Sequence, residues 1–202
     1  MDGDPHRLTA PERLILSAVP VGHALRPSTE AFIRARYAEA YGAEVPRFLP
    51  LLYALHDAQG QMLAAAGLGL AADGPLYLEQ YLDAPIERVL ADREGHPVAR
   101  HGVAEIGHLC GLLAGTGRRL FPQIAADLLR RGQHHAVFTA TRGLRTLFHR
   151  LGIDPAPLAP ASPARLDPAT AAAWGRYYAA DPWVIGGALE LGRHLLGAVG
   201  HG

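Results

Sequence analysis

Two glutamates stand inside otherwise apolar stretches of the sequence, Glu79 in LYLEQYL and Glu105 in GVAEIGHL. A buried carboxylate costs free energy unless it is paired or hydrogen-bonded, so each must face solvent, find a partner or line a cleft. A carboxylate in a cleft can have a raised pKa and then serve as the general base that deprotonates an amine. Simple strand alternation offers the other interpretation, in which one or both glutamates face solvent; Glu79 would then share its face with Tyr77 and Tyr81.

The turn AGTGRR at residues 114–119 precedes an amphipathic helical pattern and is a candidate phosphate site. A helix N-terminus presents unpaired N–H groups and a partial positive charge, and glycine lets a phosphate approach the backbone. Gly115 and Gly117 would form the turn, while Arg118 and Arg119 would contact phosphate directly. Taken alone, the motif fits an ordinary turn before a helix equally well, because it lacks the full pattern of a nucleotide-binding loop.

The sequence contains no motif typical of a metal site or of a catalytic nucleophile. The 11 histidines include no H-E-x-x-H motif, and the neighbours His134 and His135 would point to opposite faces of a strand. No G-x-S-x-G motif is present either. We therefore expect no metal site and no covalent nucleophile. Cys110 is the single cysteine, expected to be a small buried residue in a reducing compartment.

Composition indicates a globular protein with a sizeable core. Hydrophobic residues make up 49% of the 202 residues and charged residues 19%, too apolar a mixture for disorder. Basic and acidic residues number 19 each, so we expect no nucleic-acid partner. The N-terminus lacks the pattern of a signal peptide, and the longest apolar run, residues 62–72, is too short to span a bilayer. We expect a cytoplasmic protein without a transmembrane segment.

The elements that would position these residues alternate along the chain. Residues 1–13 are expected to be a flexible lead-in. A helix is expected to begin at an N-cap, Ser28 or Thr29, and to end at Gly42. Pro122 is tolerated only in a first turn, which places the start of a later helix near Phe121 or a bend there. The strands are expected within 13–19, on both sides of the DAQG hairpin, at 74–83, within 98–112 and from Ala136, with a short helix at 84–95 and another ending at Gly152.

The order of these elements predicts an α/β fold with antiparallel hairpins early and βα units late. We expect one domain over residues 14–202, including a proline-rich connector at 155–170 and a C-terminal segment at 171–202. That segment is expected to pack on the sheet as a last strand, although a lid or a dimer contact would also fit it.

Five segments resemble the thermostable hemolysin family, in the same order along the chain. They are FIRARYAEAYGAEVPRFLPLLYALHDAQGQMLAAAGL, GPLYLEQYLDAPIE, VAEIGHL, VFTATRGLRTLFHRLGI and WGRYYAADPWVIGGAL, which together extend from about residue 30 to 190. That family looks like a branch of the GNAT acyl-CoA N-acyltransferase fold, close to the N-acyl-homoserine-lactone synthases and the N-acyl amino acid synthases. The resemblance implies a mixed, mostly antiparallel central sheet with helices on both faces.

The resemblance also implies a site. Two neighbouring parallel strands would separate, with the thioester of the acyl donor in the gap, Glu105 on the first strand and Thr139, Thr141 and Arg142 at the end of the second. AGTGRR would hold the pyrophosphate of the donor. The homoserine-lactone synthases carry E-x-x-R where this chain has Glu105 and His108, so that substrate is in doubt. The expected catalytic residues are Glu105, Glu79 and His108; a tyrosine general acid, frequent in GNAT enzymes, has no match.

The function implied is transfer of an acyl group from a thioester, either acyl-CoA or an acyl carrier protein, to the amine of a small molecule. No tightly bound cofactor is expected, and a homodimer is one expected state. Two other functions stay open: a GNAT-shaped binding protein without catalysis, and a membrane-active hemolysin.

Overall fold

A computed structural model of the chain describes residues 14–111 and 116–189. It contains one seven-stranded sheet in the order β1-β2-β3-β4-β5-β7-β6. The strands are β1 Ile15–Pro20, β2 Leu51–His56, β3 Met62–Leu70, β4 Val103–Cys110, β5 His135–Ala140, β6 Ala156–Pro160 and β7 Trp183–Ala188. Only β4 and β5 pair in parallel; every other neighbouring pair is antiparallel, so the mixed, mostly antiparallel sheet is confirmed.

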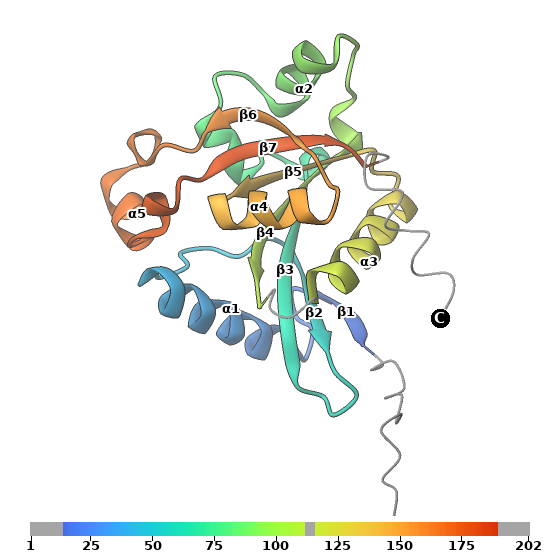
Figure 1. Ribbon diagram of the computed structural model, residues 1–202, viewed down its shortest axis with the longest axis vertical. Coiled ribbons are helices and arrows are strands. Elements are labelled where there is room, and N and C mark those ends of the chain that lie inside the picture. The colour runs from blue at the N-terminus through green and yellow to red at the C-terminus, as the bar shows by residue number, and fades with distance from the viewer. Residues whose placement is uncertain (1–13, 112–115, 190–202) are drawn as a thin grey trace, which may run out of the picture.

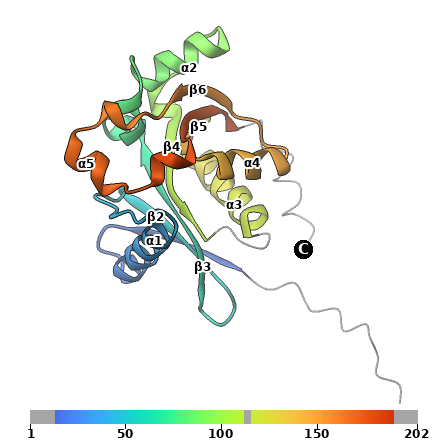
Figure 2. The same ribbon diagram turned by 60° about the vertical axis from the view of Figure 1, so that its left-hand side comes forward.

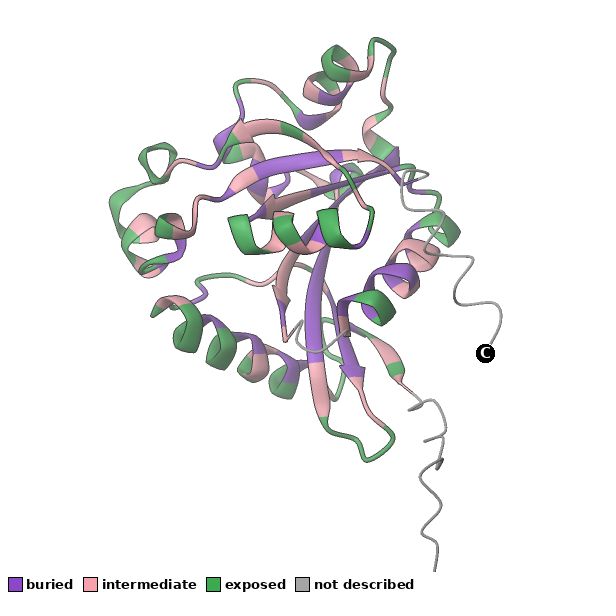
Figure 3. Cartoon of the chain, viewed as in Figure 1, coloured by how far each residue is buried: buried purple, intermediate pink, exposed green. Residues whose placement is uncertain are grey.

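Helices cover both faces of this sheet (Figures 1 and 2). The helices are α1 Arg26–Tyr41, α2 Ile86–Glu94, α3 Thr116–Arg130, α4 Arg142–Arg150 and α5 Pro168–Ala173. Ile33 of α1 packs with Leu52 and Val137 on one face, called the α1 face below. Leu120 of α3 packs with Leu55 and Ile106 on the other, the α3 face. Burial is concentrated in the strands, whereas α1, α2 and α4 turn exposed residues outward (Figure 3).

Several sequence predictions hold, because their local signals agree with the packing. The DAQG hairpin joins β2 to β3, and β7 adds the C-terminal segment to the sheet. Gly42 and Gly152 end α1 and α4 in the left-handed region, with φ of 64° and 70°. The predictions for residues 1–13, for Gly115 and for the last part of the C-terminal segment concern residues outside the described ones.

The predicted strand at 74–83 is wrong: Tyr77–Tyr81 form a 3-10 helix, η2. The Glu79 carboxylate accepts a hydrogen bond from the Leu76 N–H at 2.7 Å, which caps this turn and removes the strand alternation. The proline-rich connector likewise contains β6, which the sequence did not predict.

The predicted starts of two helices, α1 and α3, are also too late in the sequence. Helix α1 begins at Arg26 with a proline in its first turn, and the Ser28 and Thr29 hydroxyls donate to the Leu25 carbonyl instead of capping N–H groups. Helix α3 begins at Thr116 and contains Pro122. In its second turn this proline costs at most one intrahelical hydrogen bond, that to the carbonyl four residues earlier.

Replacing Gly175 by alanine should destabilise the protein by about 1–3 kcal/mol. Gly175 has φ of 52°, and a Cβ there would lie 2.5 Å from the Tyr41 carbonyl oxygen and 2.7 Å from that of Gly42. Both carbonyls belong to the end of α1, so the collision is with backbone. Urea unfolding measures the loss. Gly143→Ala is the matched control, since its Cβ meets no atom closer than 4.0 Å, and it should be neutral or slightly stabilising.

Candidate functional site

The strands β4 and β5 separate part-way along the sheet. Their parallel register runs from Val103–His135 to Ile106–Phe138 and ends there. Beyond this point β4 continues beside β3 only, and β5 continues beside β7. The sheet therefore opens between two neighbouring parallel strands, as the resemblance implies. We call this opening the β4/β5 gap.

A bulge in β4 borders the gap. The β3 ladder pairs Gly67 with Gly107 and next pairs Ala65 with Cys110, so His108 and Leu109 together oppose a single residue. His108 has φ of 52°, which is uncommon for a residue with a side chain. A bulge interrupts the regular ladder and leaves backbone groups without their strand partners. N–H groups freed by a bulge can polarise a carbonyl group placed beside them.

An apolar cavity of ≈ 70 Å³ begins at the gap on the α3 face. Ile106 and Phe138, the last paired residues of β4 and β5, form one wall. Helices α3 and α4 contribute Ala125 and Phe148. The remaining lining residues are Phe121, Ile124, Leu128, Ala136, Ile153, Pro155, Gly187, Ala188 and Leu189. None of the lining side chains carries a charge, so the cavity suits an apolar group.

Glu105 lies on the opposite face from this cavity. It is 3% exposed, and its Oε2 accepts a hydrogen bond from the Tyr77 N–H at 2.7 Å. Burial raises the pKa of Glu105 to about 7, against the opposing effect of backbone N–H groups of Tyr77 and Leu78. A carboxyl group with this pKa is partly ionised near neutrality, as a general base requires.

Glu79 is held by several donors. Its Oε1 accepts from Arg100 Nη1 at 2.7 Å and from the Ile86 N–H at 2.8 Å, and its Oε2 accepts from Arg100 Nη2 at 3.0 Å in addition to the Leu76 N–H. Burial acts to raise its pKa, but the hydrogen bonds from Arg100, Ile86 and Leu76 outweigh it and lower the pKa below the usual value. This geometry favours a structural role for Glu79.

The His108 side chain is also held by contacts with other parts of the chain. Its Nε2 accepts a hydrogen bond from the Leu49 N–H at 3.1 Å, and its ring packs on Phe48. Burial and the nearby Arg26 guanidinium lower the pKa of His108 to about 4. The ring is therefore neutral near pH 7 and acts as an acceptor toward the backbone before β2.

The predicted donor-binding residues fall into two groups. Gly117, Arg118 and Arg119 lie in the first turn of α3, with Gly117 buried and both arginines exposed. The space at Gly117 is limited, because a Cβ there would lie 3.2 Å from the Phe121 ring. A phosphate group would find at this turn the N–H groups of a helix N-terminus and two cations.

The second group lies at the end of β5. The Thr139 Oγ1 is buried and has no hydrogen-bond partner among the described residues. Thr141 accepts from the Leu144 N–H at 3.4 Å and caps α4, while Arg142 is exposed with its Nη2 3.5 Å from an Asp181 oxygen. Of these residues, Thr139 has the hydroxyl that a ligand in the gap would satisfy.

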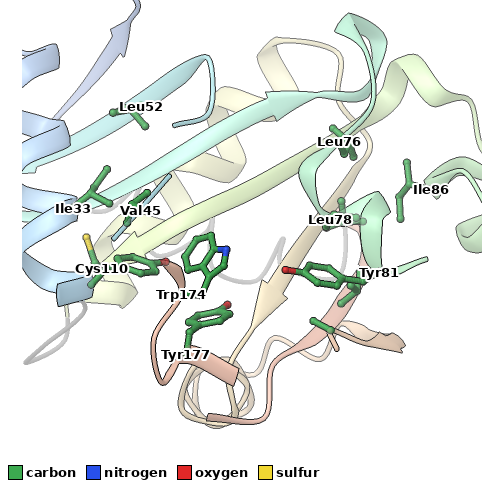
Figure 4. Packing of buried hydrophobic residues seen from close by; sticks show 14 of the residues in the cluster. Ile33, Val45, Leu52, Leu76, Leu78, Tyr81, Ile86, Cys110, Trp174 and Tyr177 are labelled. Carbon is green, nitrogen blue, oxygen red and sulfur yellow. The ribbon is translucent and has the colours of Figure 1, made fainter. Parts of the chain in front are cut away.

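The sequence did not identify the aromatic cluster on the α1 face beside Glu105. Trp174 and Tyr177, from the C-terminal segment, lie beneath β4 close to Tyr81 (Figure 4). Trp174 Nε1 donates to the Tyr77 hydroxyl at 2.9 Å, and the Tyr177 hydroxyl donates to the Thr139 carbonyl oxygen at 3.2 Å. The available signal was composition: six of the seven tyrosines fall in the short segments YAEAY, YLEQY and RYY.

Other kinds of site are not found in the described part of the chain. Among residues 14–111 and 116–189, no group of three or more metal-ligating side chains is placed to hold a metal ion. No helix within those ranges is long and apolar enough to cross a membrane.

Comparison with known proteins places this geometry among related folds. The family described as thermostable hemolysin matches residues 19–193. The N-acyl amino acid synthase FeeM, from uncultured soil microbes, has a similar structure: TM-score 0.62, 14% identity, 92% of this chain and 96% of FeeM covered. The CoA-dependent acyl-homoserine lactone synthase BjaI matches with a TM-score of 0.59 and 13% identity, over 93% of this chain and 90% of BjaI. The AHL synthase LasI matches with a TM-score of 0.57 and 13% identity, over 89% of this chain and 91% of LasI. A comparison with curated proteins finds no match.

Proposed function

The chain belongs to the thermostable hemolysin family, and from this premise we propose that it is an acyltransferase that moves an acyl group from a thioester to the amine of a small molecule. One observation carries the proposal: the sheet opens after Ile106 and Phe138, with an apolar cavity on one face of the gap and the buried Glu105 on the other. FeeM, BjaI and LasI, which share the fold, are an N-acyl amino acid synthase and two acyl-homoserine lactone synthases.

The donor would occupy the gap and the cavity behind it. Its acyl chain would lie among Phe121, Ala125 and Phe148, where it is removed from water. Its phosphates would contact the first turn of α3, where Arg118 and Arg119 are exposed. The Thr139 hydroxyl would donate to a polar group of the donor near the thioester. The donor is acyl-CoA or an acyl carrier protein, bound as substrate and not as a resident cofactor.

The reaction would be a direct transfer. The amine nitrogen attacks the thioester carbonyl carbon, the C–N bond forms, and the C–S bond breaks. Ionised Glu105 takes a proton from the amine and the thiolate leaves. The proton then passes from Glu105 through solvent to the thiolate, which restores the ionised carboxylate. Backbone N–H groups at the β4 bulge would stabilise the negative charge that develops on the carbonyl oxygen. The products are an amide and a free thiol.

Release of this thiol is the direct test. The protein would be incubated with C4 to C16 acyl-CoA thioesters and a panel of small amines, and the free thiol detected with a thiol reagent. Cys110 is buried and burial raises its pKa to about 12, so the protein contributes little background. Amine-dependent thiol release supports the proposal. A rise in melting temperature without release would indicate a binding protein that lacks catalysis, and leakage from lipid vesicles would indicate a membrane-active one.

The surroundings of the gap also bear on partners and location. Helix α4 has the sequence RGLRTLFHR, which contains no acidic residue. It lies next to the first turn of α3, since a Cβ added at Gly117 would be 3.4 Å from the Leu147 side chain. An acidic acyl carrier protein would find the cations of α4 at this end of the gap, two of which, Arg142 and Arg145, also pair with Asp181. If the thioester panel gives no thiol release, carrier-protein thioesters are the next donors. We propose a cytoplasmic location, where both donors are made.

Replacing Ala125 by phenylalanine should shorten the acyl chain that the enzyme accepts. Ala125 lines the cavity, so the larger ring would fill space that a long chain needs. We expect kcat/KM to fall at least about 10-fold for a C12 thioester and to change little for a C4 thioester. Ala126→Phe, one residue away and outside the lining, is the control. Equal losses for both chain lengths would contradict an acyl chain in this cavity.

A further inference from the structure

The two edges of the sheet differ in whether they can accept another strand. Strand β6 carries Pro157 and Pro160, and Pro155 precedes it. Proline has no N–H, so it cannot donate to a new ladder, and edge prolines are a common protection against pairing. The β6 edge is therefore blocked.

Strand β1, at the other edge, is less protected (Figure 1). Its sequence ILSAVP contains no charged residue, and its proline stands at the last position. Ile15 at one end is 48% exposed, and Val21, directly after the other end, is 76% exposed. They are two of three large hydrophobic side chains exposed in the described part of the chain, the third being Leu129 of α3. An uncharged edge with apolar ends is typical of a strand that pairs with another chain.

We propose that β1 pairs antiparallel with β1 of a second copy, around a two-fold axis near Ser17. A strand paired with its own copy in this way is self-complementary, since each N–H that one copy offers meets a carbonyl of the other. The six residues carry no charge that would face a like charge across the axis. The formal net charge of zero also removes long-range repulsion between copies.

The dimer is independent of the proposed activity. Strands β2 and β3 separate β1 from β4, so pairing at β1 leaves the β4/β5 gap uncovered. In the dimer the two seven-stranded sheets become one continuous sheet. Exposed Ile15 of one copy would then pack near the Val19–Val21 end of the other.

Sedimentation velocity of the full chain, between about 1 and 100 µM, tests the proposal. Wild type should sediment as a dimer at the upper concentrations. Ser17→Lys places two cations opposite each other at the axis and should weaken the dimer at least about 10-fold. Ser17→Thr, which keeps an uncharged strand residue, should dimerise like wild type. A monomeric wild type, or equal dimerisation of the lysine variant, overturns the proposal.

Disulfide formation gives a second measurement that does not depend on how well the lysine variant folds. Residues facing each other across an antiparallel pair have Cα atoms about 4.5–5.5 Å apart, within the range of a disulfide. The Ser17→Cys variant should therefore form a covalent dimer on mild oxidation, while buried Cys110 does not react. Val21→Cys, beyond the strand, is the position control and should cross-link far less. Equal cross-linking at both positions would contradict pairing centred on Ser17.

Discussion

Replacing Glu105 by glutamine should lower kcat by about 10²–10⁴-fold and leave binding of the thioester donor nearly unchanged. The amide cannot take the amine proton, yet it keeps the size of the carboxyl group and an oxygen that accepts from the Tyr77 N–H. Because the apolar cavity lies on the other face of the sheet, donor affinity should not depend on Glu105. Steady-state kinetics and a donor-dependent rise in melting temperature measure the two quantities separately. Full turnover by this variant would exclude Glu105 as the base.

The pH dependence gives an independent check. Burial raises the pKa of Glu105 to about 7, so activity of the wild type should rise with pH, with its midpoint near 7, and level off at higher pH. The free energy of unfolding should change with pH in the opposite direction to the activity. The unfolded chain loses this proton near its ordinary pKa of about 4.3, whereas the folded protein keeps it until about pH 7. The free energy of unfolding should therefore fall as pH rises from about 4.3 to about 7, by roughly 3–4 kcal/mol in total, and stay level above 7; Glu105→Gln should remove this loss.

Replacing Arg100 by alanine should reduce the free energy of unfolding by about 2–4 kcal/mol. Arg100 joins two carboxylates, Glu79 and Glu87, each 2.7 Å from its Nη1, and it also donates to the carbonyl oxygens of Ala71 and Gly74. The Glu79 side chain is only 14% exposed, so it would be left as a poorly solvated charge. Partial exposure of Arg100 keeps the loss below that of a fully buried pair. The melting temperature should fall by about 5–12 °C.

Arg88→Ala is the matched control, because Arg88 is exposed on α2 and should change stability by less than about 0.5 kcal/mol. A double-mutant cycle with Glu79→Gln then separates the pair from the rest of the network. In the glutamine background, loss of Arg100 should cost clearly less than in the wild type. Equal losses in both backgrounds would show that Glu79 is not the group Arg100 neutralises.

Much of the fold could be predicted because local signals and packing agree. The hairpin after β2, the glycine ends of α1 and α4, and the late βα units follow from turn chemistry and periodicity. The stretch at 74–83 failed for the opposite reason. The alternation of its residues suits a strand, but Glu79 caps a turn and pairs with Arg100. Arg100 lies 21 residues further along the chain, so the local sequence pattern gives no sign of this pairing. Strand β6 was missed because prolines suggest a connector, although an edge strand tolerates them.

The candidate site was predicted unevenly. Glu105 stands out because a carboxylate in an apolar strand needs an explanation, and the structure places it beside the gap with a raised pKa. His108 was expected from the resemblance alone, and its ring accepts a hydrogen bond from the Leu49 N–H. Tyr177 and Trp174 gave no signal of their own. They come near Glu105 only because the chain returns across the α1 face before β7, a path that depends on the whole fold.

The apolar cavity and Glu105 lie on opposite faces of the sheet, next to the place where β4 and β5 stop pairing. In the proposed reaction, a donor in the cavity and an amine at Glu105 would therefore approach from opposite faces. Neither has to leave before the other arrives, so both would be bound together when the acyl group moves. Initial-rate plots against either substrate should then intersect, as for a ternary complex, rather than run parallel, as for a ping-pong exchange.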